Sequence, residues 1–201
     1  MKKILLLFLL LLPFAMQGAD DAQAVMRKAA SKIRGASTVR ADFTLSAPGM
    51  DFRGSLKSKG KKFAVVSDGS SSWYDGKALY TYSPATAETT LITPSATDLL
   101  ECNPLLYIGD ADAYKAMFSK VQPKDRYAIV LVPRAKGSGI KNIELQLDRR
   151  SLLPLRIVIN SESAGSMTVA ISKVVVNTPL SDSEFVYPKQ KYPYTKIIDL
   201  R

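Results

Sequence analysis

Histidine is absent from this chain of 201 residues, and cysteine occurs once, as Cys102. Without an imidazole the chain cannot carry Ser-His-Asp or Cys-His catalysis, or a zinc site that depends on histidine ligands. A single cysteine excludes an intramolecular disulfide and a thiolate metal cluster. No glycine-rich phosphate-binding loop is present. We therefore expect no catalytic residue, metal or cofactor, and we expect that the protein is not an enzyme.

The remaining residues that could take part in catalysis or metal binding are better explained by structural roles. Ser58–Lys61 matches the S-x-x-K pattern, but it spans a predicted hairpin turn and lacks the partner motifs. Asp75 lies in a predicted turn, where a carboxylate accepts hydrogen bonds from its own backbone. Cys102 follows two leucines closely, so a small buried hydrophobe is favoured over a reactive thiol.

Long apolar runs are also missing, except near the N-terminus. Two lysines precede the apolar run 4–12, and a proline and small residues follow it up to Ala19. This pattern is typical of a secretory signal peptide, and the run is shorter than the roughly 20 residues that span a bilayer. We predict a signal peptide over 1–19, cleaved near Gly18 or Ala19, and one domain over 20–201. The mature protein is expected to be secreted and soluble, without a lipid anchor because no cysteine lies at the cleavage site.

The chain is basic, with a formal net charge of +10, which removal of the two N-terminal lysines lowers by two. Such a charge suits an anionic partner or a membrane surface. Nucleic acid is not expected as a partner, because the protein is exported and its basic residues are spread along the chain. The densest basic group, within Lys57–Lys62, is interpreted as the solvated end of a hairpin, where lysine discourages edge pairing.

The stretch Val39–Ile92 organises the fold through alternation of apolar and polar residues. Phe52, Gly54 and Leu56, for example, alternate with polar neighbours, which is the period-two pattern of a half-buried strand. Turn formers separate the segments, and the connections are too short for crossover helices, so neighbouring strands must be antiparallel. Further strands are predicted over 127–132, 140–147, 155–159 and 167–176, for a total of about nine or ten.

Helices are predicted before and within this series of strands. An amphipathic helix over Asp20–Arg34 should be capped by Asp20 or Asp21 and end at Gly35. A helical insert follows the first strands, and a capping box is predicted near the C-terminus. The insert comprises a helix capped by Ser95 with Asp98 at its third position, a short segment Leu105–Ile108 after Asn103-Pro104, and a helix over Asp110–Lys120, while the capping box is Ser181–Glu184.

This element order predicts a mainly β, α+β domain. Two architectures fit it: a closed up-and-down barrel, or a strongly curved, unclosed antiparallel half-barrel with helices in its mouth. The helical insert among the strands favours the half-barrel. Its apolar face could be a filled core or could line a cavity for an acyl chain, and the residues alone place a filled core slightly ahead.

Several short motifs occur in a specific order and spacing along almost the whole mature chain. They are Ser37–Thr44, Gly54–Leu56, Lys59–Phe63, Asp75–Pro84, Asn103–Leu106 and Phe185–Pro188. In these motifs the chain resembles the periplasmic lipoprotein carriers of the LolA family. The resemblance implies an unclosed barrel with a helical lid, which holds lipoprotein acyl chains and passes them from an inner-membrane ABC transporter complex to an outer-membrane acceptor.

Together with the apolar face of the sheet, the resemblance predicts an acyl-chain site in a protein that we expect to be a monomer. The predicted lining residues are Phe43, Leu45, Phe52, Leu56, Phe63, Val65 and Trp73 in the sheet and Leu99, Leu100, Leu105 and Leu106 in the lid.

The chain departs from the family pattern at Lys59-Gly60, where the family typically has Arg-Pro. In the family that arginine hydrogen-bonds the lid and helps to keep the empty cavity shut. Lysine lacks the planar fork of arginine. Lys59 is therefore the predicted lid latch, either holding the lid more weakly or marking a member with another cargo.

Three functions remain open, with the lipoprotein carrier favoured. Relatives of the same fold also carry other lipids, or serve as envelope sensor modules that bind a protein partner. A well-packed interior without a cavity would favour the sensor. An enzyme acting on envelope lipids or polymers would require acid-base residues clustered in a cleft.

Overall fold

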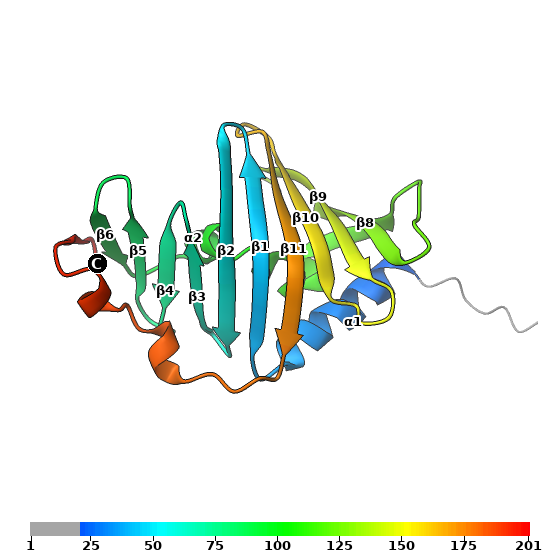
Figure 1. The fold of residues 1–201 in the computed structure, drawn as a ribbon. Helices are drawn as coiled ribbons and strands as arrows, with labels where there is room; N and C mark the ends of the chain where they lie inside the picture. The colour runs from blue at the N-terminus through cyan, green and yellow to red at the C-terminus, as the bar shows by residue number, and fades with distance from the viewer. Residues whose placement is uncertain (1–20) are drawn as a thin grey trace, which may run out of the picture.

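The computed structural model describes residues 21–201, so the predicted signal peptide and the alternative cap Asp20 lie outside the described residues. A single 12-stranded sheet forms the body of the protein (Figure 1). Its strands are β1 (Val39–Ala47), β2 (Met50–Lys59), β3 (Lys62–Ser67), β4 (Ser71–Tyr74), β5 (Leu79–Ser83), β6 (Glu88–Ile92), β7 (Tyr114–Phe118), β8 (Arg126–Pro133), β9 (Ile140–Asp148), β10 (Pro154–Ser161), β11 (Ser166–Val176) and β12 (Lys196–Asp199).

The strand order confirms the unclosed, mainly β fold. The order is β12-β6-β5-β4-β3-β2-β1-β11-β10-β9-β8-β7, so β12 and β7 form the two edges. Neighbouring strands are antiparallel except for β12, which pairs with β6 in parallel. Each strand from β1 to β6 forms a hairpin with the next one, because the connections between them are too short for a crossover. Pairing of β1 with β11 then joins the first six strands to the second series in one curved sheet.

Helix α1 (Ala22–Gly35) covers the inner face of the sheet over β7–β11 (Figure 1). The predicted cap is confirmed, because Asp21 accepts a hydrogen bond from the backbone N–H of Gln23. The buried stripe of the helix includes Val25, Met26 and Ala29, as its periodicity predicts. These residues pack on the inner face of the second half of the sheet, where Ile129, Leu145 and Ile157 are fully buried. This half of the protein is a filled core.

The helical insert forms two helices at the other end of the same face. Helix α2 (Ala96–Cys102) begins with the predicted capping box of Ser95 and Asp98, and α3 (Leu106–Gly109) follows after one turn. The side chain of Asn103 accepts a hydrogen bond from the N–H of Leu105 at 3.1 Å, which fixes that turn. We call α2, α3 and this turn the lid.

The helix predicted over Asp110–Lys120 is wrong. A short 3-10 helix, η1 (Ala111–Ala113), leads instead into edge strand β7. Burial alternates along β7, with Tyr114 and Ala116 inside and Lys115 and Met117 outside. The same apolar residues also fit a helical spacing, and pairing with β8 decides in favour of the strand.

The outer face of β2–β6 is covered by residues 177–195, which we call the C-terminal segment. It includes the 3-10 helices η2 (Asp182–Phe185), which has the predicted capping box, and η3 (Lys189–Lys191). Phe185 and Tyr187 are buried against the sheet, and β12 then pairs with β6. Within the described residues, no helix has the length and apolarity that a membrane crossing would require.

Candidate functional site

The inner faces of β1–β3 form a continuous apolar layer, as the alternation predicts. Cross-strand register places Leu45 beside Phe52. An added Cβ at Gly54 would lie 2.7 Å from the carbonyl oxygen of Val66 and 2.8 Å from the Phe43 ring, so this close packing requires glycine. Five of the predicted lining residues belong to this layer: Phe43, Leu45, Phe52, Leu56 and Val65. Phe43, Leu56 and Val65 are buried in the same hydrophobic cluster as the apolar stripe of α1, which we call the main core, so their side chains already have apolar neighbours.

A cleft of about 490 Å³ lies beside this layer, between the lid, the β2–β3 hairpin and the last turn of α1. We call it the lid cleft. It is lined by Ile33, Arg34, Ala36 and Val39 at the end of α1 and the start of β1, by Ser58, Gly60, Lys61, Lys62, Phe63 and Tyr74 from the hairpin and β4, and by Leu99, Asn103, Leu105, Leu106 and Gly109 from the lid. Its volume lies within the range of about 300–1,000 Å³ that is common for small-molecule sites.

Four of the predicted site residues meet in the lid cleft. They are Phe63 from β3 and Leu99, Leu105 and Leu106 from the lid. Leu100 is partly buried against the main core instead. Sequence reasoning missed Ile33 and Tyr74. Ile33 lies on α1, far from the hairpin in the sequence, so the sequence does not reveal that both line one cleft.

The lid is packed unevenly over this cleft. Helix α2 has no buried residue, whereas Leu105, Tyr107 and Ile108 in and beside α3 are buried. Leu106 is 38% exposed although it lines the cleft. The lid is thus anchored through α3, whereas α2 contacts the core only through partly buried side chains, Leu99, Leu100 and Cys102.

The prediction that Trp73 lies on the inner face is wrong. In the register of β3 and β4, Tyr74 is the partner of Phe63 and Trp73 is the partner of Ala64. Alternation then directs Tyr74 towards the lid cleft and Trp73 to the outer face. There the Trp73 ring meets Tyr187 edge-on, with 5.5 Å between centroids. Two adjacent aromatic residues leave the phase of the alternation undetermined in the sequence.

The predicted contact of Lys59 with the lid is also wrong. Its Nζ donates to Oδ1 of Asp182 at 2.8 Å and to the carbonyl of Leu180 at 3.2 Å. Lys62, its cross-strand partner, donates to the other oxygen of Asp182 at 3.1 Å. Lys59 therefore ties the hairpin to the C-terminal segment on the outer face.

Burial favours the neutral form of two titratable groups near the lid, the Cys102 thiol and the Tyr114 phenol. Burial raises the pKa of the Cys102 thiol, which accepts a hydrogen bond from the hydroxyl of Ser72 at 3.6 Å. Burial likewise raises the pKa of Tyr114 to about 12. Cys102 is partly buried against the main core, in agreement with its interpretation as a small apolar group. Within residues 21–201 no set of three or more acidic, cysteine or histidine side chains is grouped as a metal site.

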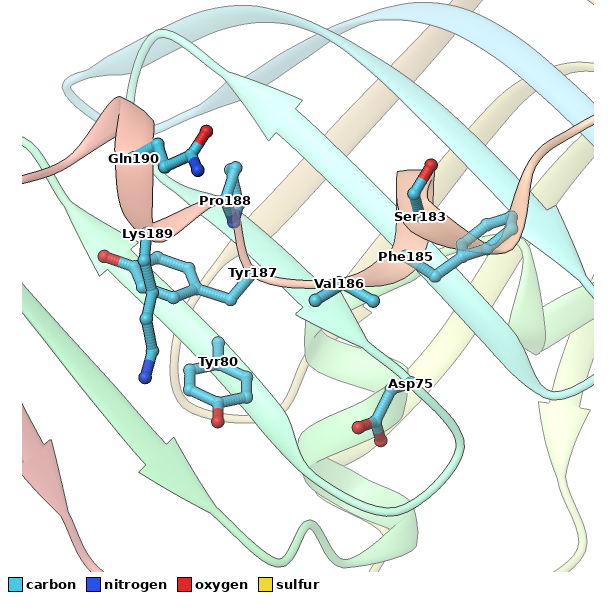
Figure 2. A pocket seen from close by; sticks show the side chains of 9 residues that line it. All are labelled: Asp75, Tyr80, Ser183, Phe185, Val186, Tyr187, Pro188, Lys189 and Gln190. Carbon is cyan, nitrogen blue, oxygen red and sulfur yellow. The ribbon is translucent and has the colours of Figure 1, made fainter.

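A second hollow, of about 600 Å³, lies on the outer face beside the C-terminal segment (Figure 2). Tyr80 and Tyr187 stack there with 5.1 Å between centroids, and Asp75 and Lys189 line the polar part of the wall. The backbone of the C-terminal segment forms much of this wall, so the hollow is the margin of its contact with the sheet. The apolar lining and the lid distinguish the lid cleft as the candidate site.

Comparisons with known proteins agree with this architecture. A family model described as outer membrane lipoprotein carrier protein LolA matches residues 11–163. No curated protein sequence was found to match the chain.

Solved structures with 13–16% sequence identity to this chain share its fold. A conserved protein from Thermus thermophilus has a TM-score of 0.60 and 13% identity, covering 89% of this chain and 98% of that one. A DUF1329 family protein from Desulfovibrio piger has a TM-score of 0.50 and 16% identity, covering 84% and 98%. A LolA superfamily protein from Nitrosomonas europaea has a TM-score of 0.42 and 14% identity, covering 84% and 99%.

Proposed function

The chain belongs to the family of outer membrane lipoprotein carrier protein LolA, and from this premise we propose that it carries lipid acyl chains through the periplasm in the lid cleft. The favoured cargo is the acyl chains of outer-membrane lipoproteins. On this proposal the donor is an inner-membrane ABC transporter complex and the recipient is an outer-membrane acceptor.

The observation that carries the proposal is an apolar cleft beneath a lid that is only partly buried. Phe63 and Leu105 supply buried apolar walls, and Leu106 lies at the boundary with solvent. Each methylene that moves from water into such a cleft contributes about 0.8 kcal/mol. Several methylenes therefore provide a substantial driving force without any polar contact, as a carrier of different lipidated proteins requires.

The structure also supports a particular direction of expansion. The inner-face layer of Phe43, Leu45 and Leu56 adjoins the lid cleft through β2 and β3. We propose that displacement of α2 exposes this layer and enlarges the site for a second or third acyl chain. The half of the sheet beneath α1 stays filled and provides the rigid support.

Native mass spectrometry of the mature protein from the periplasm, with lipid extraction of the same sample, tests the proposal. A bound diacyl or triacyl species supports the carrier. A protein that is free of lipid and stays so after incubation with lipoprotein contradicts the carrier and favours a sensor module that binds a protein partner.

A further inference from the structure

The mouth of the lid cleft combines an apolar interior with basic side chains. Arg34 at the end of α1 and Lys61 in the hairpin turn both line the cleft and are at least partly exposed. No acidic side chain is present among the described residues that line it. A molecule held in this cleft therefore meets apolar walls inside and positive charge at the exit.

The basic residues at the mouth differ in whether they already form an ion pair with an acidic side chain. Lys62 donates to Asp182 at 3.1 Å, so its charge is directed to the outer face. Within residues 21–201, Arg34 and Lys61 form no ion pair. These two cations come from elements on different sides of the cleft and remain available to a ligand.

We propose that the lid cleft binds lipids with an anionic headgroup in preference to zwitterionic ones, with Arg34 and Lys61 facing the negative charge. The proposal rests on the carrier function above and names the class of lipid. An anionic headgroup presents a net negative charge to both cations, whereas in a zwitterionic headgroup the choline ammonium offsets the charge of the phosphate and is repelled by the two side chains. The preference must weaken with salt, because the two side chains reach solvent and are screened over about 8 Å at physiological ionic strength.

The test compares two probes with the same acyl chains, dioleoyl phosphatidylglycerol and dioleoyl phosphatidylcholine, by lipid titration of the mature protein. The wild type should bind phosphatidylglycerol at least about three-fold more tightly, in keeping with two exposed charge interactions. The variant R34Q/K61Q should bind both lipids equally, with phosphatidylcholine affinity unchanged. K136Q removes the exposed cation of Lys136, outside the lid cleft, and should keep the preference.

The outcomes separate this inference from the proposed function. Equal binding of both lipids by the wild type overturns the headgroup preference and leaves the carrier intact. A preference that R34Q/K61Q retains also overturns it. Absence of binding to either lipid by a protein that binds lipoprotein overturns the preference, whereas absence of binding to both lipids and to lipoprotein contradicts the carrier function itself. Arg34 also lies in the last turn of α1, where a cation interacts favourably with the helix dipole, so the unfolding midpoint of each variant is measured in parallel.

Discussion

The Nζ atom of Lys59 lies 2.8 Å from Oδ1 of Asp182, and this ion pair joins the end of the β2–β3 hairpin to the C-terminal segment. Lys62 contacts the same carboxylate, and Lys57 and Arg40 contact Glu184 two residues later. These four basic residues of β1–β3 thus contact the C-terminal segment on the outer face of the sheet, while the inner face carries the lid cleft. Substitutions on one face can therefore be tested for their effect on the other.

This network predicts an acid-dependent loss of stability. Hydrogen bonds from Lys59 and Lys62 lower the pKa of Asp182, and a hydrogen bond from Lys57 lowers that of Glu184. A lowered pKa in the folded state means that the ionised carboxylate favours folding, so its contribution is present above the ordinary pKa of 3.8 for Asp or 4.5 for Glu and is lost as the pH falls through the folded value. We expect the urea midpoint to fall more steeply in the wild type than in D182N/E184Q below about pH 4.5.

Trp73 provides the measurement for this prediction. It is the only tryptophan in the chain and packs beneath Tyr187 and Tyr192 of the C-terminal segment. Its fluorescence should therefore report detachment of that segment. If the urea midpoint depends on pH equally in the wild type and in D182N/E184Q, the ion pairs do not hold the C-terminal segment on the sheet.

Phe185→Ala should destabilise the protein without affecting the lid cleft. Phe185 is 1% exposed in the outer cluster, and truncation of such a phenylalanine costs about 3–5 kcal/mol. Tyr194→Ala, at a side chain that is 98% exposed, should change the unfolding free energy by less than about 0.5 kcal/mol. Under conditions where both variants are folded, each should bind lipid with wild-type affinity, and a loss confined to Phe185→Ala would place the site on the outer face.

Leu106→Glu should weaken lipid binding while the protein remains folded. The side chain lines the lid cleft but is 38% exposed, so an empty cleft tolerates the carboxylate. Covering that carboxylate with an acyl chain costs about 2 kcal/mol or more, which corresponds to roughly 30-fold weaker binding. Val121→Glu, at a side chain that is 78% exposed and outside the cleft, serves as the matched control and should bind normally. Wild-type affinity in Leu106→Glu would remove Leu106 from the site.

Gln23→Ala should promote self-association through the β7 edge. The side chain of Gln23 accepts a hydrogen bond from the N–H of Ala116 at 3.0 Å and donates to the carbonyl of Ala111 at 2.8 Å. It thereby occupies an edge amide that would otherwise be free to pair with another strand. Light scattering coupled to gel filtration should show a concentration-dependent dimer in Gln23→Ala, but a monomer in the wild type. A monomeric variant at all concentrations would show that Gln23 does not protect this edge.

The sequence predicted the local elements of the fold well because capping and alternation are local signals. The caps at Asp21 and Ser95 and the alternating strands β1–β3 all follow from neighbouring residues. The strand β7 was mistaken for a helix because its apolar side chains and those just before it fit both periods. Only its pairing with β8, a contact between separate segments, resolves the choice.

The candidate site was less predictable because it depends on contacts between distant segments. Phe63 and the lid leucines were identified, but Arg34 and Tyr74 were not. The packing of the C-terminal segment on the outer face was also not predicted, since the sequence does not show which face of the sheet an aromatic residue such as Tyr187 contacts. The error about Lys59 has another origin: its role as lid latch was taken from the family resemblance, whereas in this chain the side chain contacts Asp182 and Leu180 of the C-terminal segment.

Photo-crosslinking with a fatty acid that carries a diazirine on its acyl chain, followed by peptide mapping, tests the central claim most directly. The account predicts crosslinks within Leu99–Leu106 of the lid and at Phe63, and their loss upon competition with unlabelled lipid. Crosslinks confined to Phe185–Gln190, beside the outer hollow of Figure 2, would contradict the assignment of the lid cleft as the acyl-chain site.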